Sequence, residues 1–465
     1  MRVLLISYHF PPDAAIGAVR PYQFARLLPE HGIETWVLTV QPQFAELRDD
    51  RLTTDDIPAD HIVRTAVYPT KRRRLIKLAA ALKTKLKGGS ANHSNGAAPA
   101  ISKNGASGGA SAIDQIPWRQ RWFMSWVFFP DNLAGWYKPA HEAAEKMLRQ
   151  TKFDAIISTS PPRVAHFLAY DLSLRYKLPW IMDLRDPWFK DIDEVHSKTL
   201  DDLYHRLFLR YSSQADAVVM NTERLREYMV KTVPSIANKA VTIPNGAKLK
   251  PRANKPALDK PAQFRVGHYG SVYSTRSAQA FLEGLRLWLD RSKINPAEVA
   301  VRFMGPEFGS TPYHVERLKL ESIVTLCPPV SRDRVTELMR EDYILLLLAN
   351  DQPLQIPGKL YEYLAVERRI LASTEADGAS ADLIRGRPGC SIVQTAEDMA
   401  NALTQYWQEY EQGSSAEIDY GDLLRECSYE RRVESLAKVI ESVTNQQPVA
   451  KVGGGFVKAY TEHSL

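Results

Sequence analysis

The sequence predicts an α/β protein of two domains, each built on a parallel sheet with helices on both faces. Short apolar runs alternate with helical stretches in both halves of the chain. Such near-continuous apolar strands are typical of parallel sheets, because both faces of the sheet are buried. The chain has 465 residues, which is longer than one hydrophobic core normally serves. We therefore expect two Rossmann-like domains.

The first domain is expected over residues 1–247. Its apolar runs, some of them rich in β-branched residues, predict strands at residues 3–6, 36–40, 155–158, 180–182, 217–220 and 241–243. Helical stretches separate these strands, at residues 21–28, 164–176 and 200–213. Residues 88–112 interrupt the alternation with Gly, Ser, Ala and Asn, a composition that has little to bury and predicts a flexible linker.

The second domain is expected over residues 263–427, after a linker at 248–262 that is rich in Pro and Lys and lacks apolar periodicity. Its predicted strands lie at residues 265–269, 299–304, 323–326, 343–349, 369–372 and 391–393. Residues 428–444 have the pattern of a final amphipathic helix. The polar, Gly-containing residues 445–465 predict a flexible tail.

Composition favours a globular protein of the cytosol. Hydrophobic residues make up 44% of the chain and charged residues 25%, and no apolar run is long enough to span a bilayer. The apolar run near Met1 is too short for the core of a signal peptide. Cys327, Cys390 and Cys427 are widely spaced and lack the rhythm of metal ligands, so we expect reduced structural thiols.

The net charge of +6 is concentrated in one segment. Between Asp60 and Asp114 every Asp, Glu, Lys or Arg is a Lys or an Arg. Within this stretch residues 71–87 combine those charges with leucines at helical spacing, which predicts a basic amphipathic helix. An anionic bilayer binds both the basic charges and the apolar leucines, whereas nucleic acid would bind only the charges. We expect peripheral binding to the inner face of the cytoplasmic membrane; the alternative is a helix packed on the first domain.

Residues 355–372 contain the most informative motif. A buried strand precedes them, and their polar residues Lys359 and Glu362 lie where a short helix begins near Pro357. Ligands of open α/β sheets gather outside the carboxyl ends of the strands, where helix N-termini favour anions. The alternative for Lys359 and Glu362 is a solvated ion pair on a helix surface.

The pattern Pro-x-Lys-x-x-Glu-Tyr-Leu-Ala from Pro357 resembles the donor-binding element of family 4-like glycosyltransferases of the GT-B fold. The resemblance implies that Glu362 receives the ribose hydroxyls of a nucleotide sugar, with Gly358 and Lys359 near its diphosphate. It also implies that the two domains face each other across a cleft and that the last helix crosses back to the first domain. One departure is Leu354, where retaining members commonly carry a second glutamate.

A second part of the expected donor site follows the strand at residues 265–269. The glycine turn at Gly270 and the basic residue Arg276 resemble the family element that neutralises the donor diphosphate. Positive charge at this point stabilises the leaving group as the sugar–phosphate bond breaks. The alternative for Arg276 is a solvated arginine at a helix start, where the helix dipole disfavours it.

In the first domain, the loop after the first strand resembles a family segment that lines the cleft, with Gly17 and Arg20 as its acceptor and phosphate residues. A plain strand-to-helix connection is the alternative. The segments Thr-Ser-Pro-Pro before His166 and Asp-x-Arg-Asp-Pro-Trp from Asp183 resemble a bacterial branch of the family. The resemblance implies that Asp183, Asp186 and His166 are the catalytic residues, which position sugar or acceptor hydroxyls. It also places Arg185 with Gly17 and Arg20 among the acceptor and phosphate residues. An internal salt-bridge cluster or a packed histidine are the alternatives.

These expectations combine into one function. The chain is expected to move a sugar from a UDP- or GDP-sugar to a lipid-linked or saccharide acceptor in bacterial surface polysaccharide synthesis, with retention of configuration. No cofactor or metal is expected, because basic side chains and helix N-termini neutralise the diphosphate. A GT-B nucleotide-sugar epimerase and a non-catalytic nucleotide-binding membrane scaffold are the alternatives.

Overall fold

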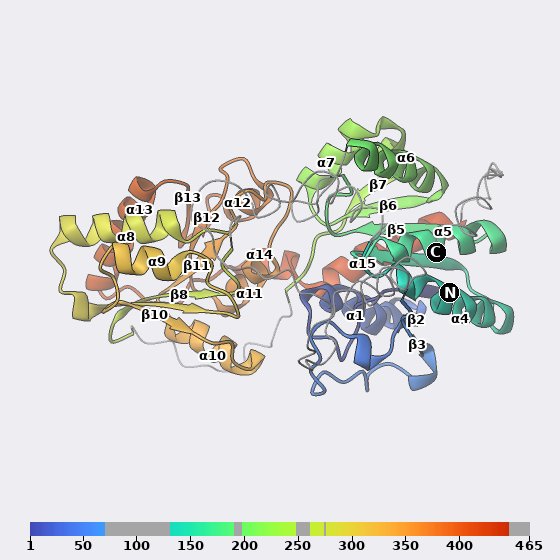
Figure 1. The fold of residues 1–465 in the computed structure, drawn as a ribbon, viewed down its shortest axis with the longest axis horizontal. Coiled ribbons are helices and arrows are strands. Elements are labelled where there is room, and N and C mark those ends of the chain that lie inside the picture. The colour runs from blue at the N-terminus through green and yellow to red at the C-terminus, as the bar shows by residue number, and fades with distance from the viewer. Residues whose placement is uncertain (70–130, 190–197, 248–260, 274–275, 446–465) are drawn as a thin grey trace, which may run out of the picture. The chain divides into compact units, whose positions relative to one another are not determined.

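The structure is a computed structural model that describes residues 1–69, 131–189, 198–247, 261–273 and 276–445. The predicted basic helix at 71–87 and the predicted linker at 88–112 lie outside these residues, as do nearly all of the predicted interdomain linker and tail. Figure 1 shows two α/β units, each with its own sheet.

The first unit comprises residues 1–221, 229–243 and the chain from Val433, and the second comprises 222–228 and 244–432. This division differs from the predicted domains in detail. Residues 222–228 were expected in the first domain but group with the second unit, and the helix that begins at Tyr429 has its first residues in the second unit and its remainder in the first.

The sheet of the first unit is parallel throughout. Among the described residues it has seven strands, in the order β3-β2-β1-β4-β5-β6-β7. The strands are β1 (Arg2–Ile6), β2 (Glu34–Val40), β3 (Ile62–Thr65), β4 (Ala155–Ser160), β5 (Trp180–Leu184), β6 (Ala217–Met220) and β7 (Ala240–Thr242). β3 was not predicted from the sequence, because this edge strand is only half-buried and lacks a continuous apolar run.

The main helices of this unit are α1 (Val19–Leu27), α4 (Tyr137–Gln150), α5 (Val164–Tyr176) and α6 (Lys198–Gln214), together with the last residues of α7 (Glu223–Thr232). Strands β1 and β4 are neighbours in the middle of the sheet, and each is followed by a helix, β1 by α1 and β4 by α5. The loops that join these strands to their helices therefore lie at the same carboxyl edge of the sheet.

Gly135 brings two distant parts of the first unit into close contact. The backbone N–H of Tyr68 donates to the carbonyl of Gly135 at 3.1 Å. A Cβ at position 135 would lie 1.8 Å from the Tyr68 carbonyl oxygen, so only glycine permits this approach. The next residue, Trp136, is fully buried, and its indole Nε1–H donates to Thr65 Oγ1 at 2.8 Å. The Gly-Trp pair therefore fixes the return of the chain beside β3.

The second unit repeats the architecture with a six-stranded parallel sheet among its described residues, in the order β10-β9-β8-β11-β12-β13. Its strands are β8 (Phe264–Tyr269), β9 (Val299–Met304), β10 (Val324–Cys327), β11 (Ile344–Leu348), β12 (Arg369–Ser373) and β13 (Cys390–Val393). Its helices are α8 (Gln279–Ser292), α9 (Thr311–Arg317), α10 (Arg332–Glu341), α11 (Gly358–Val366), α12 (Ala379–Ile384), α13 (Ala396–Glu411), α14 (Gly421–Glu426) and the start of α15 (Tyr429–Asn445).

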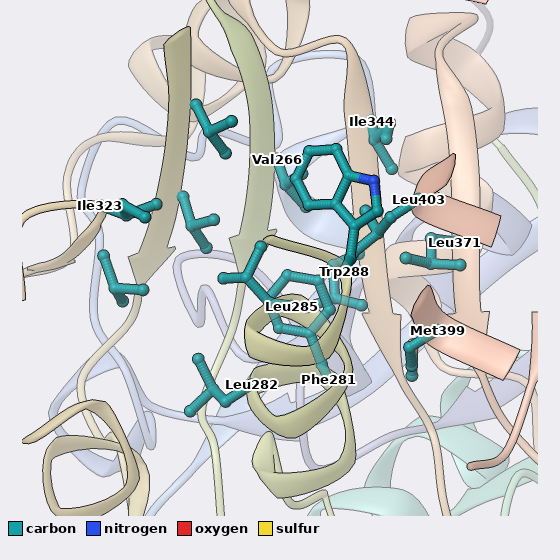
Figure 2. Close-up of a cluster of buried hydrophobic side chains, with 14 of the residues drawn as sticks. Val266, Phe281, Leu282, Leu285, Trp288, Ile323, Ile344, Leu371, Met399 and Leu403 are labelled. Carbon is teal, nitrogen blue, oxygen red and sulfur yellow. The ribbon is translucent and has the colours of Figure 1, made fainter. Parts of the chain in front are cut away.

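The core of the second unit lies on both faces of this sheet. On one face, Trp288 and its neighbours on α8 pack against strand residues such as Val266 and against α13, as Figure 2 shows. Gly284 permits this packing, because a Cβ there would lie 2.4 Å from the Cβ of Met399 on α13. On the other face, α11 buries apolar residues such as Leu360. The start of α11 is thereby held beside the carboxyl end of β11.

Candidate active site

A pocket of about 400 Å³ opens at the carboxyl edge of the first sheet. Its walls come from the segments that follow β1, β4 and β5, together with residues 44–46 and 131–133. Aromatic rings and ionisable groups share these walls, and they include Tyr8, His9, Phe44, Glu46, Asp131, Arg163, Asp186 and Trp188. Apolar surface with a few convergent polar groups is the usual composition of a small-molecule site.

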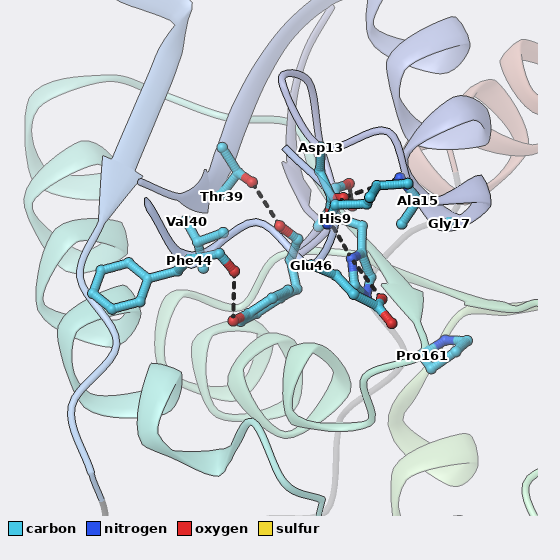
Figure 3. Close-up of polar contacts among 12 residues, drawn as sticks. His9, Asp13, Ala15, Gly17, Thr39, Val40, Phe44, Glu46 and Pro161 are labelled. Carbon is cyan, nitrogen blue, oxygen red and sulfur yellow. Dashed lines mark hydrogen bonds and ion pairs between the residues drawn. The ribbon is translucent and has the colours of Figure 1, made fainter. Parts of the chain in front are cut away.

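His9 and Asp13 form a hydrogen-bonded pair at this pocket (Figure 3). His9 Nδ1 lies 2.7 Å from Asp13 Oδ2. The other oxygen, Asp13 Oδ1, accepts from the backbone N–H groups of Ala15 at 3.0 Å and Leu47 at 3.1 Å. Burial raises the pKa of Asp13, but the hydrogen bonds from His9 and the two backbone N–H groups outweigh it, so the pKa lies below its usual range. This pair was not predicted from the sequence.

Arg185 joins the loop that contains Gly17 to the end of β4. Its guanidinium donates to the backbone carbonyls of Ser160, Pro161 and Gly17. A Cβ at position 17 would lie 2.8 Å from Arg185 Nη1 and 3.4 Å from His9 Cδ2, so glycine leaves room for both side chains. The structure thus brings Gly17 and Arg185 together, with Arg185 engaged by backbone oxygens.

Arg20 and Asp183 are partners of each other in the interior. Arg20 Nε donates to Asp183 Oδ2 at 3.1 Å and Nη2 donates to Oδ1 at 2.7 Å. Thr159 Oγ1 also donates to Asp183 Oδ2, at 2.7 Å. Both charged side chains are buried, at 2% and 1% exposure. This arrangement matches the salt-bridge alternative for Asp183, with Arg20 as the cation.

The two other predicted catalytic residues have different surroundings. Asp186 is half-buried and lines the pocket. His166 is fully buried, and its Nδ1 lies 2.7 Å from Ser158 Oγ. Burial, the largest cause, lowers the pKa of His166 to about 3. Because a general acid or base must reach the reacting atoms, this position favours the packed-histidine alternative for His166 over catalysis.

Asp131 positions the segment that bears Arg163. Asp131 Oδ2 accepts from the backbone N–H of Val164 at 2.8 Å, at the start of α5, and Oδ1 accepts from the N–H of Leu133 at 2.9 Å. An acidic group here satisfies a free N–H of the helix and suits the helix dipole. The guanidinium of Arg163 lies 4.7 Å from the Tyr204 ring centroid and 5.9 Å from that of Trp188.

The second unit contains the predicted donor residues. Gly358 and Lys359 begin α11, and Lys359 Nζ donates to Glu362 Oε2 at 2.7 Å. This ion pair is the alternative that the sequence left open, and both side chains are partly exposed, at 37% and 26%. Arg276 Nη2 donates to Gln352 at 3.1 Å, and Gly270 lies directly after β8.

His268, near the end of β8, lies close to both Arg276 and Lys359. Its Nδ1 donates to the backbone carbonyl of Leu346 at 2.9 Å, and its Nε2 is buried without a hydrogen-bond partner among the described residues. Burial lowers the pKa of His268 to about 4, and the positive charges of Arg276 and Lys359 add to this effect. Both cations therefore lie near the carboxyl end of β8.

Sequence reasoning missed His9, Asp13 and His268. His9 and Asp13 are four residues apart in a loop, so no helical or strand periodicity marks them as neighbours. Among the described residues, no group of three or more His, Cys, Asp or Glu side chains is arranged to hold a metal ion. A search of the same residues for a helix long and apolar enough to cross a membrane finds none.

Comparisons with known proteins identify the class. Residues 17–246 match the family model described as glycosyl transferase 4-like domain. A comparison of the sequence with curated proteins finds no match. Among solved structures, a glycosyltransferase from Rickettsia africae ESF-5 aligns with a TM-score of 0.56 at 12% identity, covering 96% of this chain and 99% of that one.

Two further structures align over nearly the whole chain. The Anabaena protein HepE, in complex with UDP and glucose, gives a TM-score of 0.60 at 13% identity and covers 95% of this chain and 100% of its own. Sucrose-phosphate synthase from Thermosynechococcus elongatus gives a TM-score of 0.60 at 13% identity and covers 95% and 99%. The protein therefore has the GT-B fold of glycosyltransferases. The match to the glycosyl transferase 4-like domain covers just under half of the chain, in its N-terminal part.

Proposed function

We propose that this protein transfers a hexosyl group from a UDP- or GDP-sugar to a lipid-linked or saccharide acceptor in the synthesis of a bacterial surface polysaccharide. The observation that carries the proposal is the placement of Arg276 and Lys359 in the second unit. Both cations lie close enough to His268 to lower its pKa, at the carboxyl edge of β8 and β11. A diphosphate leaving group needs positive charge at such an edge.

In this proposal each donor residue has a separate task. Arg276 and Lys359 neutralise the charge that grows on the diphosphate as the glycosidic bond breaks. Glu362 accepts hydrogen bonds from the ribose hydroxyls, and the free N–H groups at Gly358 face the phosphates. Because these groups supply the positive charge, we propose that turnover needs no metal ion. Activity that survives EDTA would support this point, and activity restored only by added Mg²⁺ or Mn²⁺ would contradict it.

The structural neighbours suggest which donor to test first. HepE has been crystallised with UDP, with UDP and glucose, and with UDP-glucose. The resemblance in fold supports UDP-glucose as the first candidate, with other UDP-sugars and GDP-sugars after it. We also propose retention of configuration at the transferred sugar, which the anomeric coupling constant of the product would show. At position 354 this chain has Leu where retaining members of the family commonly carry a glutamate. The configuration of the product is therefore to be measured directly.

The pocket of the first unit is the proposed acceptor site. Its aromatic residues Tyr8, Phe44 and Trp188 offer flat apolar surface, and Arg163 and Asp186 offer polar contacts. This combination suits a sugar, which has both apolar faces and hydroxyls. For a lipid-linked acceptor we propose that the protein works at the inner face of the cytoplasmic membrane. The basic residues 71–87, which lie outside the described residues, would bind that surface.

One assay separates the candidate functions. The purified protein would be incubated with each nucleotide sugar, with and without lipid-linked and saccharide acceptors, and the products identified by mass spectrometry. Release of nucleoside diphosphate that depends on an acceptor, together with a new glycoside, supports transfer. Isomerised donor without a glycoside indicates an epimerase. Binding of nucleotide without turnover of any donor indicates a scaffold, and would overturn the proposal.

A further inference from the structure

We propose that His9 accepts the proton of the acceptor hydroxyl during transfer and that Asp13 holds its imidazole in place for this step. The inference deepens the proposed function and rests on it, because it names the group that activates the acceptor. It adds a catalytic residue, His9, and a positioning residue, Asp13, to the acceptor side of the reaction.

The hydrogen bonds of the pair define which nitrogen is available. Asp13 is buried and receives two backbone N–H groups on Oδ1, which leaves Oδ2 for His9 at 2.7 Å. An ionised carboxylate can only accept, so the imidazole must place its proton on Nδ1. Nε2 then carries the lone pair. This is the state that a general base requires.

Nε2 is also on the accessible edge of the ring. His9 lines the 400 Å³ pocket, and about 10% of its side chain is exposed. None of the hydrogen bonds among the described residues involves His9 Nε2, and this nitrogen is not one of the buried polar atoms that lack a partner. Cδ2, the carbon next to Nε2, lies on the side of Gly17, where the missing Cβ leaves space. Figure 3 shows the ring between Asp13 and Glu46.

Other charged groups surround the imidazole and enter its pH dependence. Glu46 Oε2 lies 4.0 Å from His9 Nδ1, but its side chain is mostly exposed. The guanidinium of Arg185 packs against Gly17 on the other side. Arg163, Asp131 and Asp186 line the same pocket. Asp186, a predicted catalytic carboxylate that reaches this pocket, is the competing candidate for the same proton.

The proposed step conserves atoms and charge. The acceptor oxygen forms a bond to the anomeric carbon of the donor sugar on the face from which the phosphate departs, as retention of configuration requires, and its proton passes to His9 Nε2. The bond between the anomeric carbon and the phosphate oxygen breaks, and the nucleoside diphosphate leaves with the electron pair. The imidazolium then shares its charge with Asp13 and returns the proton to solvent. The competing possibility is that the leaving diphosphate takes the proton itself.

The test compares His9→Gln and Asp13→Asn with a matched control, His141→Gln. His141 Nδ1 on α4 lies 4.0 Å from Glu145 Oε1 in the same i, i+4 spacing, but outside the pocket lining. Each full-length variant would be assayed with the donor and acceptor that the wild type uses, across pH 5 to 9. UDP binding and thermal unfolding would be measured in parallel to show that the variant is folded.

We expect His9→Gln to lower kcat by about 10²-fold to 10⁴-fold, the usual contribution of a general base, with UDP affinity unchanged. The acid limb of the pH profile should disappear in this variant, and added imidazole should restore activity to His9→Ala. Asp13→Asn should lower kcat and move the acid limb, and His141→Gln should behave as wild type.

The outcomes separate this inference from the proposed function. If the wild type transfers sugar and His9→Gln keeps its kcat and its pH profile, the inference about His9 is wrong and the transferase assignment stands. The same conclusion follows if His9→Gln unfolds and imidazole fails to rescue a folded His9→Ala. If the wild type transfers no sugar at all, the proposed function fails first and the role of His9 falls with it.

Discussion

The guanidinium of Arg20 donates hydrogen bonds to both carboxylate oxygens of Asp183 inside the first unit, at 3.1 Å and 2.7 Å. Arg20 lies in the first turn of α1 and Asp183 lies in β5, so the pair ties a helix to a strand 163 residues away in the sequence. A fork of parallel hydrogen bonds is the strongest geometry for such a pair. The contact makes two residues that the sequence placed in the active site into structural partners.

Removing one member of this pair should destabilise the protein. In Arg20→Met the Asp183 carboxylate would stay buried without its cation, which typically costs about 3–5 kcal/mol. Urea unfolding followed by tryptophan fluorescence would measure the loss. The control is Arg291→Met, which breaks a bidentate pair with Glu397 at the surface and should cost far less, because water screens an exposed pair. Equal losses in the two variants would contradict this view of Arg20.

A second prediction concerns pH and the buried carboxyl of Asp342. Burial raises the pKa of Asp342 to about 7, against the lowering effects of the Tyr269 hydroxyl and Arg302. The folded protein therefore holds this proton more tightly than the unfolded chain, so the free energy of unfolding should fall as pH rises from about 4 to about 7. A shift of this size corresponds to roughly 4 kcal/mol.

Asp342→Asn should remove this dependence. The amide stays neutral at every pH and keeps an oxygen for the Tyr269 hydroxyl, so the variant should be more stable than wild type at pH 8 and similar at pH 4. Thermal unfolding at both pH values checks the point. An Asp342→Asn variant that loses stability equally at both values would show that the carboxyl is ionised in the folded protein.

The donor site gives a third prediction. Glu362→Gln should weaken UDP binding by about 1–3 kcal/mol, because a charged hydrogen bond to the ribose is lost. Isothermal titration calorimetry with UDP would measure the affinity. Glu337→Gln is the matched control, since Glu337 forms the same i, i+3 ion pair with Arg334 on α10. If both variants bind UDP as wild type does, Lys359 and Glu362 form only a surface ion pair.

The basic segment gives a fourth prediction. Changing Arg72, Arg73, Arg74 and Lys77 to Gln should release the protein from anionic vesicles while UDP binding survives, because each basic residue contributes about 1 kcal/mol near an anionic surface. Wild-type binding should weaken as salt rises. Vesicle sedimentation would measure both effects. The control changes four exposed lysines elsewhere to Gln, namely Lys138, Lys231, Lys293 and Lys319. Equal partition to neutral and anionic vesicles would refute membrane docking through charge.

Much of the fold follows from local pattern. Continuous apolar runs such as those of β4 and β11 are buried on both faces, so the sequence marks them clearly. β3 escapes prediction because its stability comes from pairing with β2 at an edge and not from its own apolar content. Helix α4 was missed for a related reason, since most of its residues are polar and its buried ones, such as Ala140 and Ala144, are small.

The candidate site was harder to predict than the fold. Position after a strand gave Asp186 and Asp183 the same expected role, although Asp186 lines the pocket and Asp183 is buried against Arg20. Asp183 is buried because it still lies within β5, where its side chain faces Arg20. Asp186 comes after the end of the strand. Whether a charged side chain meets a partner or a pocket depends on residues far away in the sequence, and a single sequence does not show that pairing.

The close contact between Tyr68 and Gly135 has a consequence for protein engineering. Because the N–H of Tyr68 bonds the carbonyl of Gly135, the two flanks of residues 70–130 are held together at one point. Any connection engineered between Tyr68 and Gly135 therefore starts and ends at neighbouring points. Its length can be varied at little cost, since the entropy of closing a loop changes only slowly with its length.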